Sequence, residues 1–202
     1  MSKSKKYIKT QNEILDVAWD LISEKGADVS IAEIAKAAGL SRQSVYLHFG
    51  SRGNLLVALV RRADVRFDIK DGFFNSFKIS GPQDRLEGAI SVWLDFVPKI
   101  YPVAKDLIRL RATDKDASLA WEDRMEELKE WLLVLTTTLE KDDVLQDHWT
   151  SKDACCFLWA GFSVQMWGLL VYECGWSEEK TRDHIRMSLV RSLLKSPFNG
   201  DN

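Results

Sequence analysis

Residues 30–49 constrain the fold of this chain more than any other stretch, because helix start and stop signals recur there in register (SIAEIAKAAGLSRQSVYLHF). Ser30 is followed three residues later by Glu33, which is the spacing of a capping box at a helix N-terminus. Gly39 is typical of a helix end that needs a positive φ, and Ser41 is a good N-cap for a second helix. The stretch therefore predicts two short helices joined by a tight turn. Their inward faces comprise Ile31, Ile34, Ala35, Ala38, Val45 and Phe49.

A helical hairpin of this kind has the geometry of a helix-turn-helix, in which the second helix enters the major groove of double-stranded DNA. Arg42 and Gln43 open that second helix, and their side chains pair well with guanine and adenine edges respectively. Short or planar polar groups around them are suited to phosphate oxygens. The candidate DNA-binding residues are Ser30, Ser41, Arg42, Gln43, Ser44, Tyr46, His48 and Arg52. The alternative is an ordinary helical hairpin whose exposed residues are merely solvated.

The same region resembles a known family. The segment GADVSIAEIAKAAGLSRQSVYLHFGSRGNLL is similar to the DNA-binding domain of the TetR family of transcription regulators, over roughly residues 8–62. The matching positions are Gly26, Ser30, Ile34, Ala35, Ala38, Gly39, Leu40, Ser41, Tyr46, His48, Phe49, Ser51, Arg52, Leu55 and Leu56. Gly53 departs from the pattern, because the family usually has an acidic residue there at the start of the fourth helix. Glycine is a poor helix former, so the departure weakens that helix start.

The resemblance implies a variable, all-helical C-terminal domain that binds a small effector and forms a homodimer. It also implies that dimers without effector sit on a palindromic operator and usually repress transcription. We therefore expect an all-α protein with an N-terminal helix-turn-helix DNA-binding domain and a C-terminal effector-binding and dimerisation domain. The expected parts are residues 1–50, a connector helix within 51–72, and residues 73–202. An activator, or a regulator without an inducer, is the alternative.

The distribution of charge agrees with DNA contact at one end only. The whole chain has a net charge of −2. Residues 1–62 carry 10 Lys and Arg against 6 Asp and Glu, whereas the remainder carries 18 against 24. A basic N-terminal part beside an acidic remainder fits a protein that contacts DNA with one end. The first ten residues include Lys3, Lys5, Lys6 and Lys9 and are expected to be either a solvated tail or a basic arm that contacts phosphates.

An enzyme is the competing class of protein, and we expect no catalytic activity. His48, His148 and His184 form no recognisable metal or nucleophile motif with the cysteines, and no glycine-rich phosphate loop is present. No cofactor and no metal are therefore predicted. A lysine-rich start without a following apolar run gives no secretion signal. Cys155, Cys156 and Cys174 do not form a disulfide framework, so we expect reduced, buried thiols and a cytoplasmic protein. A helical dimer that has lost DNA binding is a third possibility, against which the polar residues of the second helix argue.

Several breaks are expected in the C-terminal part. Gly72, Gly81 and Pro82 predict a loose passage after the connector helix, which should run from about residue 52 to 69. Pro98 and Pro102 predict an interruption of the next helix. A long helix with an apolar seam is expected over residues 114–141, and a final helix over about 178–195.

Eight tryptophans in 202 residues suggest either dense core packing or a pocket with aromatic walls. The candidate effector pocket comprises Trp93, Phe96, Tyr101, Trp131, Phe157, Trp159, Phe162 and Gln165. Such a pocket favours a small apolar or aromatic effector, or a lipophilic cation bound through cation–π contact.

Residues 154–172 contain no charge and are long enough to cross a membrane. Their small and polar residues, and the lack of a second apolar span, favour instead a helix buried on all sides. Small residues recur every seven positions, at Ala154, Gly161, Gly168 and Gly175, which predicts a close helix–helix seam. The expected dimer interface uses this helix and the final one, through Gly161, Gly168, Ile185, Leu189 and Leu193.

Overall fold

The computed structural model describes residues 3–195, and the side chains of Lys3 and Ser4 are not part of that description. Apart from one isolated β-bridge, between Leu145 and Leu194, every regular element within 3–195 is a helix, as expected. The chain packs as two compact units. Unit 1 runs to Phe67 and includes Lys99–Met125, and unit 2 contains Asp68–Pro98 and the chain from Glu126 onward. The domain boundaries expected at residues 50 and 72 stay a prediction. Each compact unit combines two separate segments of the sequence, so a single boundary in the sequence does not separate the units.

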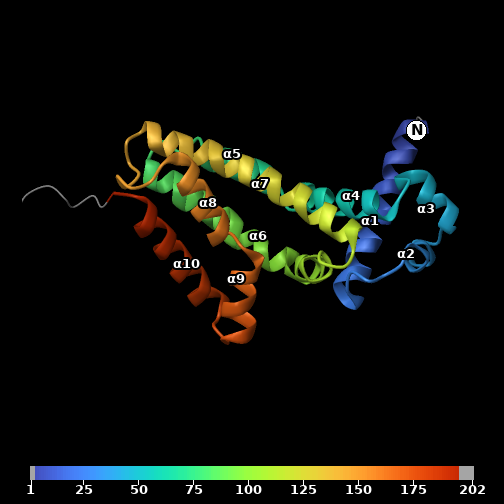
Figure 1. Ribbon diagram of the computed structural model, residues 1–202. Coiled ribbons are helices and arrows are strands. Elements are labelled where there is room, and N and C mark those ends of the chain that lie inside the picture. Colours follow the sequence, from blue (N-terminus) through green and yellow to red (C-terminus); the bar gives the residue numbers. More distant parts are fainter. Residues whose placement is uncertain (1–2, 196–202) are drawn as a thin grey trace, which may run out of the picture. The chain divides into compact units, whose positions relative to one another are not determined.

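Unit 1 contains α1 (Lys3–Lys25), α2 (Ile31–Ala37), α3 (Arg42–Phe49) and α4 (Arg52–Arg66) (Figure 1). It also contains the C-terminal part of α6 (Pro82–Leu110) and the start of α7 (Lys115–Lys141). Its core is apolar and closed to solvent. Side chains with 2% exposure or less include Ile14, Ala18, Ile34, Val45, Leu55 and Leu59.

The predicted capping signals of α2 and α3 are confirmed. Ser30 Oγ accepts a hydrogen bond from the backbone of Glu33, and the Glu33 carboxylate accepts one from the backbone N–H of Ser30 at 2.9 Å. The backbone N–H and the hydroxyl of Ser30 both donate to this carboxylate and hold the pKa of Glu33 below its ordinary value. Gly39 has φ +67°, and Ser41 Oγ accepts from the backbone N–H of Ser44 at 3.1 Å. The start and direction of α3 are therefore fixed by local chemistry.

Residues 3–10 are helical and not a tail. Met1 and Ser2 lie outside the described residues, and α1 already begins at Lys3. The reason is tertiary, because Tyr7 and Gln11 of this first part hold the end of α3. Tyr7 Oη and Gln11 Nε2 both donate to the carbonyl oxygen of His48, at 3.3 and 3.0 Å. The role of residues 3–10 as a basic arm that contacts phosphates stays a prediction.

The predicted break at Pro98 and Pro102 is wrong. Both prolines lie inside α6, which is continuous for 29 residues. Each proline removes one backbone hydrogen bond, but apolar residues on both sides bury a continuous stripe that offsets the loss. That stripe includes Trp93, Leu94, Val97, Val103, Ala104 and Leu107.

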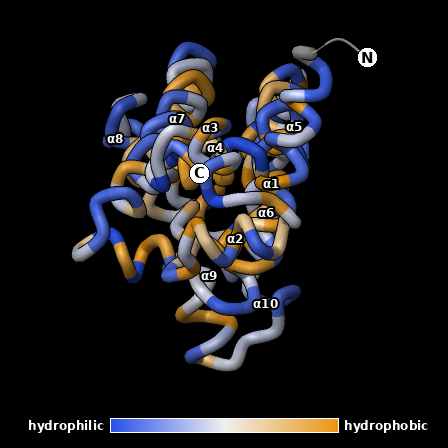
Figure 2. The backbone as a smooth tube through the Cα atoms, turned by 90° about the vertical axis from the view of Figure 1, so that its right-hand side faces the viewer, coloured by the Kyte–Doolittle hydropathy of each residue, from blue (hydrophilic) through white to orange (hydrophobic). Residues whose placement is uncertain are grey.

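Unit 2 contains α5 (Ile69–Ser76), the first part of α6, most of α7, α8 (Ser151–Gly161), α9 (Val164–Gly168), the π-helix η1 (Leu169–Glu173) and α10 (Glu178–Leu193). The loose passage expected after α4 is instead the helix α5, which starts after Asp68 at φ +50°. The seam predicted on α7 is confirmed by Leu128, Leu132, Leu135 and Leu139, all fully buried. Figure 2 shows the corresponding alternation of apolar and polar residues along α7.

The apolar run near the C-terminus is not one helix. Residues Ser151–Glu173 are long and apolar enough to span a membrane, with a mean hydropathy of 1.6 in the best window, of which 39% is buried within the chain. However, α8 ends at Gly161, and Ser163 caps a new helix by accepting from the backbone N–H of Met166 at 2.9 Å. A polar cap in mid-segment is unsuited to a lipid-exposed span.

The thiols are only partly as expected. Cys155 is buried, and its pKa is raised by burial, whereas Cys156 and Cys174 are exposed. The run is buried on one side only, which is why two thiols reach the surface.

Candidate nucleic-acid interface

The outward face of α3 carries the side chains that sequence analysis placed in the major groove. Val45 and Phe49 anchor the helix in the core of unit 1, at 0% and 8% exposure. Arg42 and Gln43, in the first turn of α3, are exposed. Tyr46 follows one turn later with 38% of its surface exposed. A rigid, capped helix therefore presents an arginine, a glutamine and a tyrosine to solvent.

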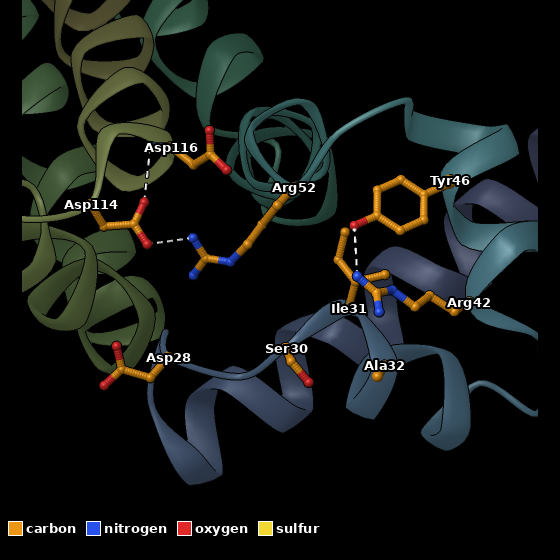
Figure 3. A pocket seen from close by; sticks show the side chains of 9 residues that line it. All are labelled: Asp28, Ser30, Ile31, Ala32, Arg42, Tyr46, Arg52, Asp114 and Asp116. Atoms are coloured by element: carbon orange, nitrogen blue, oxygen red, sulfur yellow. Dashed lines mark hydrogen bonds and ion pairs between the residues drawn. The ribbon is translucent and has the colours of Figure 1, made fainter.

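Arg42 and Tyr46 are in contact with each other. Arg42 Nη2 donates to Tyr46 Oη at 3.3 Å, and the guanidinium carbon lies 5.5 Å from the centre of the tyrosine ring. Figure 3 shows the two side chains pointing toward one another beside Ile31. They form one wall of a crevice of about 550 Å³, whose other walls come from the start of α2, from Arg52 and from the loop between α6 and α7.

The serines act first as helix caps. The hydroxyl oxygens of Ser30 and Ser41 accept hydrogen bonds from backbone N–H groups in the first turns of α2 and α3. Ser44 is half-buried. The Ser30 hydroxyl also donates to Glu33 Oε2 at 2.8 Å, whereas the exposed Ser41 hydroxyl can still donate outward. Their contact with DNA stays a prediction, and the structure adds that they orient the two helices.

His48 is not an outward group. Its ring is half-buried and packs against the ring of Tyr7, with 4.4 Å between ring centres. Its Nδ1 atom is buried and has no hydrogen-bond partner within the part of the chain that the structure describes. The helical spacing predicted exposure because it could not show that α1 covers this end of α3.

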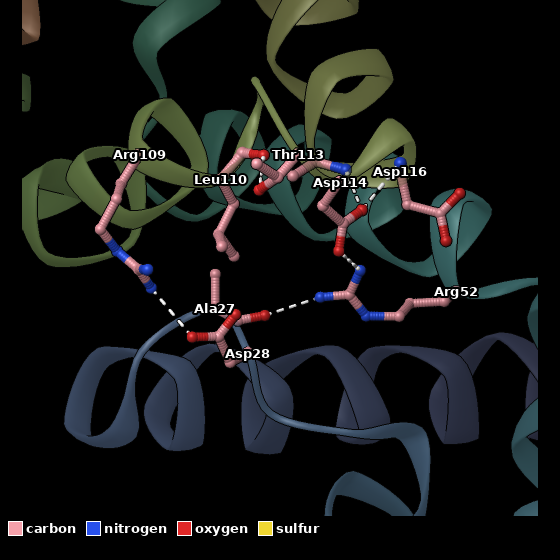
Figure 4. A network of polar contacts seen from close by, with 9 residues as sticks. Ala27, Asp28, Arg52, Arg109, Leu110, Thr113, Asp114 and Asp116 are labelled. Atoms are coloured by element: carbon pink, nitrogen blue, oxygen red, sulfur yellow. Dashed lines mark hydrogen bonds and ion pairs between the residues drawn. The ribbon is translucent and has the colours of Figure 1, made fainter.

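Arg52 is also engaged within unit 1. Its guanidinium donates to Asp114 Oδ2 at 2.5 Å and to the carbonyl oxygen of Ala27 at 2.7 Å, and its side chain is 23% exposed (Figure 4). It thus joins the start of α4 to the turn before α2 and to the loop before α7. Its contact with DNA stays a prediction, and the structure shows a structural role for this side chain.

Asp114 is the partner that sequence analysis did not single out. Burial disfavours its charged form, but the backbone N–H of Ala117 and the charge of Arg52 outweigh this effect, so the pKa of Asp114 lies below its ordinary value. A second ion pair, Arg109 with Asp28 at 3.0 Å, ties α6 to the turn before α2 (Figure 4). No sequence motif predicts these two ion pairs, because the residues that form them are 62 and 81 positions apart in the sequence.

The residues expected to form an effector pocket fall into three groups. Trp93, Phe96, Trp131 and Phe162 are at most 5% exposed and belong to the core of unit 2. Trp93 stacks on Phe162 with 5.4 Å between ring centres. Phe157, Trp159 and Gln165 are exposed, and Tyr101 belongs to unit 1. The structure therefore does not bring these eight residues into one cavity.

Phe73 of α5 was missed and lies at the centre of the aromatic core. Its ring is 5.7 Å from Trp131 and 6.1 Å from Phe162, and it is fully buried. The signal for it was the helical spacing of Ile69, Phe73 and Ser76, which was obscured by Gly72 inside the helix and by Gly81 and Pro82 after it.

The expected dimer residues face inward. Ile185, Leu189 and Leu193 are at most 4% exposed, and Gly168 is buried as well. Gly161 packs against Leu189 of the same chain, since a Cβ atom at Gly161 would come within 2.5 Å of Leu189 Cδ2. At Gly161 the small residue therefore meets α10 of the same chain, and the buried side chains of Ile185, Leu189 and Leu193 are already covered within that chain.

Comparison with known proteins agrees with the hairpin geometry. Residues 14–59 match the family described as bacterial regulatory proteins, tetR family. A 47-residue stretch is 47% identical to the HTH-type transcriptional regulator AcrR of Shigella flexneri, covering 23% of this chain and 22% of that protein. The chain thus matches about a fifth of the length of that relative.

Solved structures are similar over nearly the whole chain. The crystal structure of a putative TetR-family transcriptional regulator from Rhodococcus sp. is similar with a TM-score of 0.76, at 14% identity, covering 91% of this chain and 98% of that one. A putative transcriptional regulator from Saccharomonospora viridis, solved in complex with choline, has a TM-score of 0.71 at 19% identity, covering 93% and 99%. At these identities the similarity shows a shared fold.

Proposed function

We propose, because residues 14–59 match the TetR family of bacterial regulatory proteins, that the chain is a DNA-binding transcription regulator, and not an enzyme, that works as a homodimer. The observation that carries the proposal is the capped helix α3, which presents Arg42, Gln43 and Tyr46 to solvent from a rigid core. Arginine and glutamine at the start of a recognition helix are suited to base edges in the major groove.

Dimerisation would pair two such helices. Two recognition helices related by a twofold axis reach successive major grooves when they are roughly 34–36 Å apart, which requires a palindromic operator. Exposed apolar side chains on α8 and α10 support a contact between subunits there, in place of the buried residues first expected. They are Cys156, Phe157, Trp159, Ala160 and Met187.

An effector would bind unit 2 and release the operator. By linkage, a ligand that releases DNA must bind the free protein better than the DNA-bound protein. The aromatic residues of the unit 2 core support a small apolar or aromatic ligand, or a cation held over an aromatic ring. One structural relative was solved with choline, so choline is the first cation to test by quenching of tryptophan fluorescence. Release of DNA by the ligand indicates a repressor with an inducer. DNA binding that does not change with the ligand indicates a regulator without an inducer. DNA binding that requires the ligand indicates that the ligand promotes binding to the operator.

Selection of bound fragments from a random duplex pool by the purified full chain tests the DNA-binding proposal. The expected result is an enriched palindrome whose affinity falls steeply with salt, because phosphate contacts release counterions. The variant Gln43→Ala, which changes an exposed side chain, serves as a matched control that should bind with altered preference. A protein that enriches no sequence and binds no duplex at low salt contradicts the proposal.

A further inference from the structure

The contact between Arg42 and Tyr46 has a consequence for sequence recognition. We propose that Tyr46 is a positioning residue that holds the guanidinium of Arg42, so that the two residues together specify one base pair of the operator. This inference rests on the proposed function, since it concerns how the DNA is read. If the two side chains did not interact, each would have its own role: the arginine would contact a base and the tyrosine a phosphate.

The geometry couples the two side chains. They are four residues apart on α3, so they lie on the same face of the helix, one turn from each other. The phenol oxygen accepts a hydrogen bond from Arg42 Nη2 at 3.3 Å, and the guanidinium carbon is 5.5 Å from the ring centre. Figure 3 shows the phenol oxygen directed at the guanidinium, with the side chain of Ile31 beside them.

Holding the guanidinium favours base reading for an entropic reason. An arginine side chain has several rotatable bonds, and fixing them on binding opposes association. A guanidinium has five N–H groups, and one hydrogen bond to Tyr46 leaves the others available for the two acceptors of guanine. A side chain that is already oriented loses less freedom when it meets the base, so Tyr46 increases the preference for that base.

A phosphate contact by Tyr46 predicts different behaviour. A hydroxyl that only binds a phosphate contributes equally to every sequence, because phosphates carry no base identity. A hydroxyl that orients Arg42 contributes only where Arg42 meets its preferred base. The pattern of loss over operator variants therefore separates the two roles, whereas the affinity for one operator does not.

The test measures the affinity of the full chain for the selected operator and for every single base-pair substitution of it. Arg42→Ala should reduce discrimination at one base pair of each half-site by about 5- to 150-fold. Tyr46→Phe should reduce discrimination at that same base pair by about three- to tenfold, the effect of one hydrogen bond. The double variant should discriminate no worse than Arg42→Ala alone, because Tyr46 acts through Arg42.

Two controls accompany these variants. Gln43→Ala should lose preference at a different base pair, and Arg42→Lys should keep phosphate attraction while losing the preference. The thermal midpoint of Tyr46→Phe should equal that of the wild type, because the ring stays and is exposed. Uniform weakening by Tyr46→Phe, a loss at another base pair, or additive losses in the double variant each overturn the inference while leaving DNA binding intact. A wild-type chain that binds no duplex overturns both the proposed function and this inference.

Discussion

Gly53 makes room for Asp116. A Cβ atom on Gly53 would lie only 2.7 Å from Asp116 Oδ1, although the two residues come from the starts of different helices, α4 and α7. The family resemblance predicts an acidic side chain at position 53. In this chain, the carboxylate of Asp116 lies beside the first turn of α4 instead. It supplies negative charge near a helix N-terminus, where such charge is favourable.

Gly53→Glu should therefore destabilise the protein, although glutamate is the better helix former by nearly 1 kcal/mol. Its side chain would meet Asp116, and two carboxylates would share one site. We expect a loss of about 1 kcal/mol in the free energy of unfolding, measured with urea on the full chain. In an Asp116→Ala background the same substitution should become stabilising, because the new glutamate then has the site to itself. An equal effect of Gly53→Glu in both backgrounds contradicts this account.

The ion pair of Arg52 and Asp114 predicts a pH dependence. The pKa of Asp114 is lowered in the folded protein, so its contribution is present above the ordinary value of 3.8 and is lost as the pH falls through the lower folded value. Near neutral pH, Asp114→Asn should cost about 1 kcal/mol, a modest figure because the pair is partly exposed. Urea unfolding should show that the difference from wild type shrinks as the pH falls below 3.8. A difference that stays constant down to the lowest pH excludes Asp114 as its source.

Local chemistry made the two short helices within residues 30–49 predictable. The capping box of Ser30 and Glu33, the positive φ of Gly39 and the cap at Ser41 are all encoded within a few residues, and all are found. The prolines of α6 show the opposite case. Propensity predicted a break, but burial of a long apolar stripe on both sides of Pro98 outweighs the loss of single hydrogen bonds. Tertiary packing decides such cases, and a single sequence does not display it.

The residues of the candidate nucleic-acid interface also divide into those that local sequence predicts and those that depend on tertiary contacts. Arg42 and Gln43 were predictable, because exposure at the start of α3 follows from helical period once Val45 and Phe49 are known to face the core. His48 and Arg52 were not, because their partners are Tyr7 of α1 and Asp114 before α7. The contact of Gly161 with Leu189 was misassigned for a related reason. A small-residue repeat predicts close helix approach but not whether the second helix belongs to the same chain.

Gly161→Ala should destabilise the single chain, and not only a dimer. The new methyl group would come within 2.5 Å of Leu189 Cδ2 and 3.2 Å of Cδ1, in a contact with little free space. Overpacking of this kind typically costs about 1–3 kcal/mol. Urea unfolding at several protein concentrations measures it, because a loss within the chain does not depend on concentration. In a Leu189→Ala background, Gly161→Ala should cause little further loss of stability, because the leucine methyl groups that it would meet are gone. A purely concentration-dependent loss returns Gly161 to the subunit interface.

The exposed apolar residues of α8 and α10 predict where the dimer separates. Met187 is 41% exposed on α10, and Ala160 is exposed on α8. Glutamate at either position would place a charge in a desolvated contact between subunits, which costs several kcal/mol when the charge has no partner. We therefore expect Met187→Glu and Ala160→Glu to give monomers in light scattering, with helical content unchanged by circular dichroism. Leu133→Glu is the matched control, because Leu133 is 39% exposed on α7, outside the proposed interface, and its variant should stay dimeric. If both interface variants remain dimers while the control dissociates, the interface lies on α7 and not on α8 and α10.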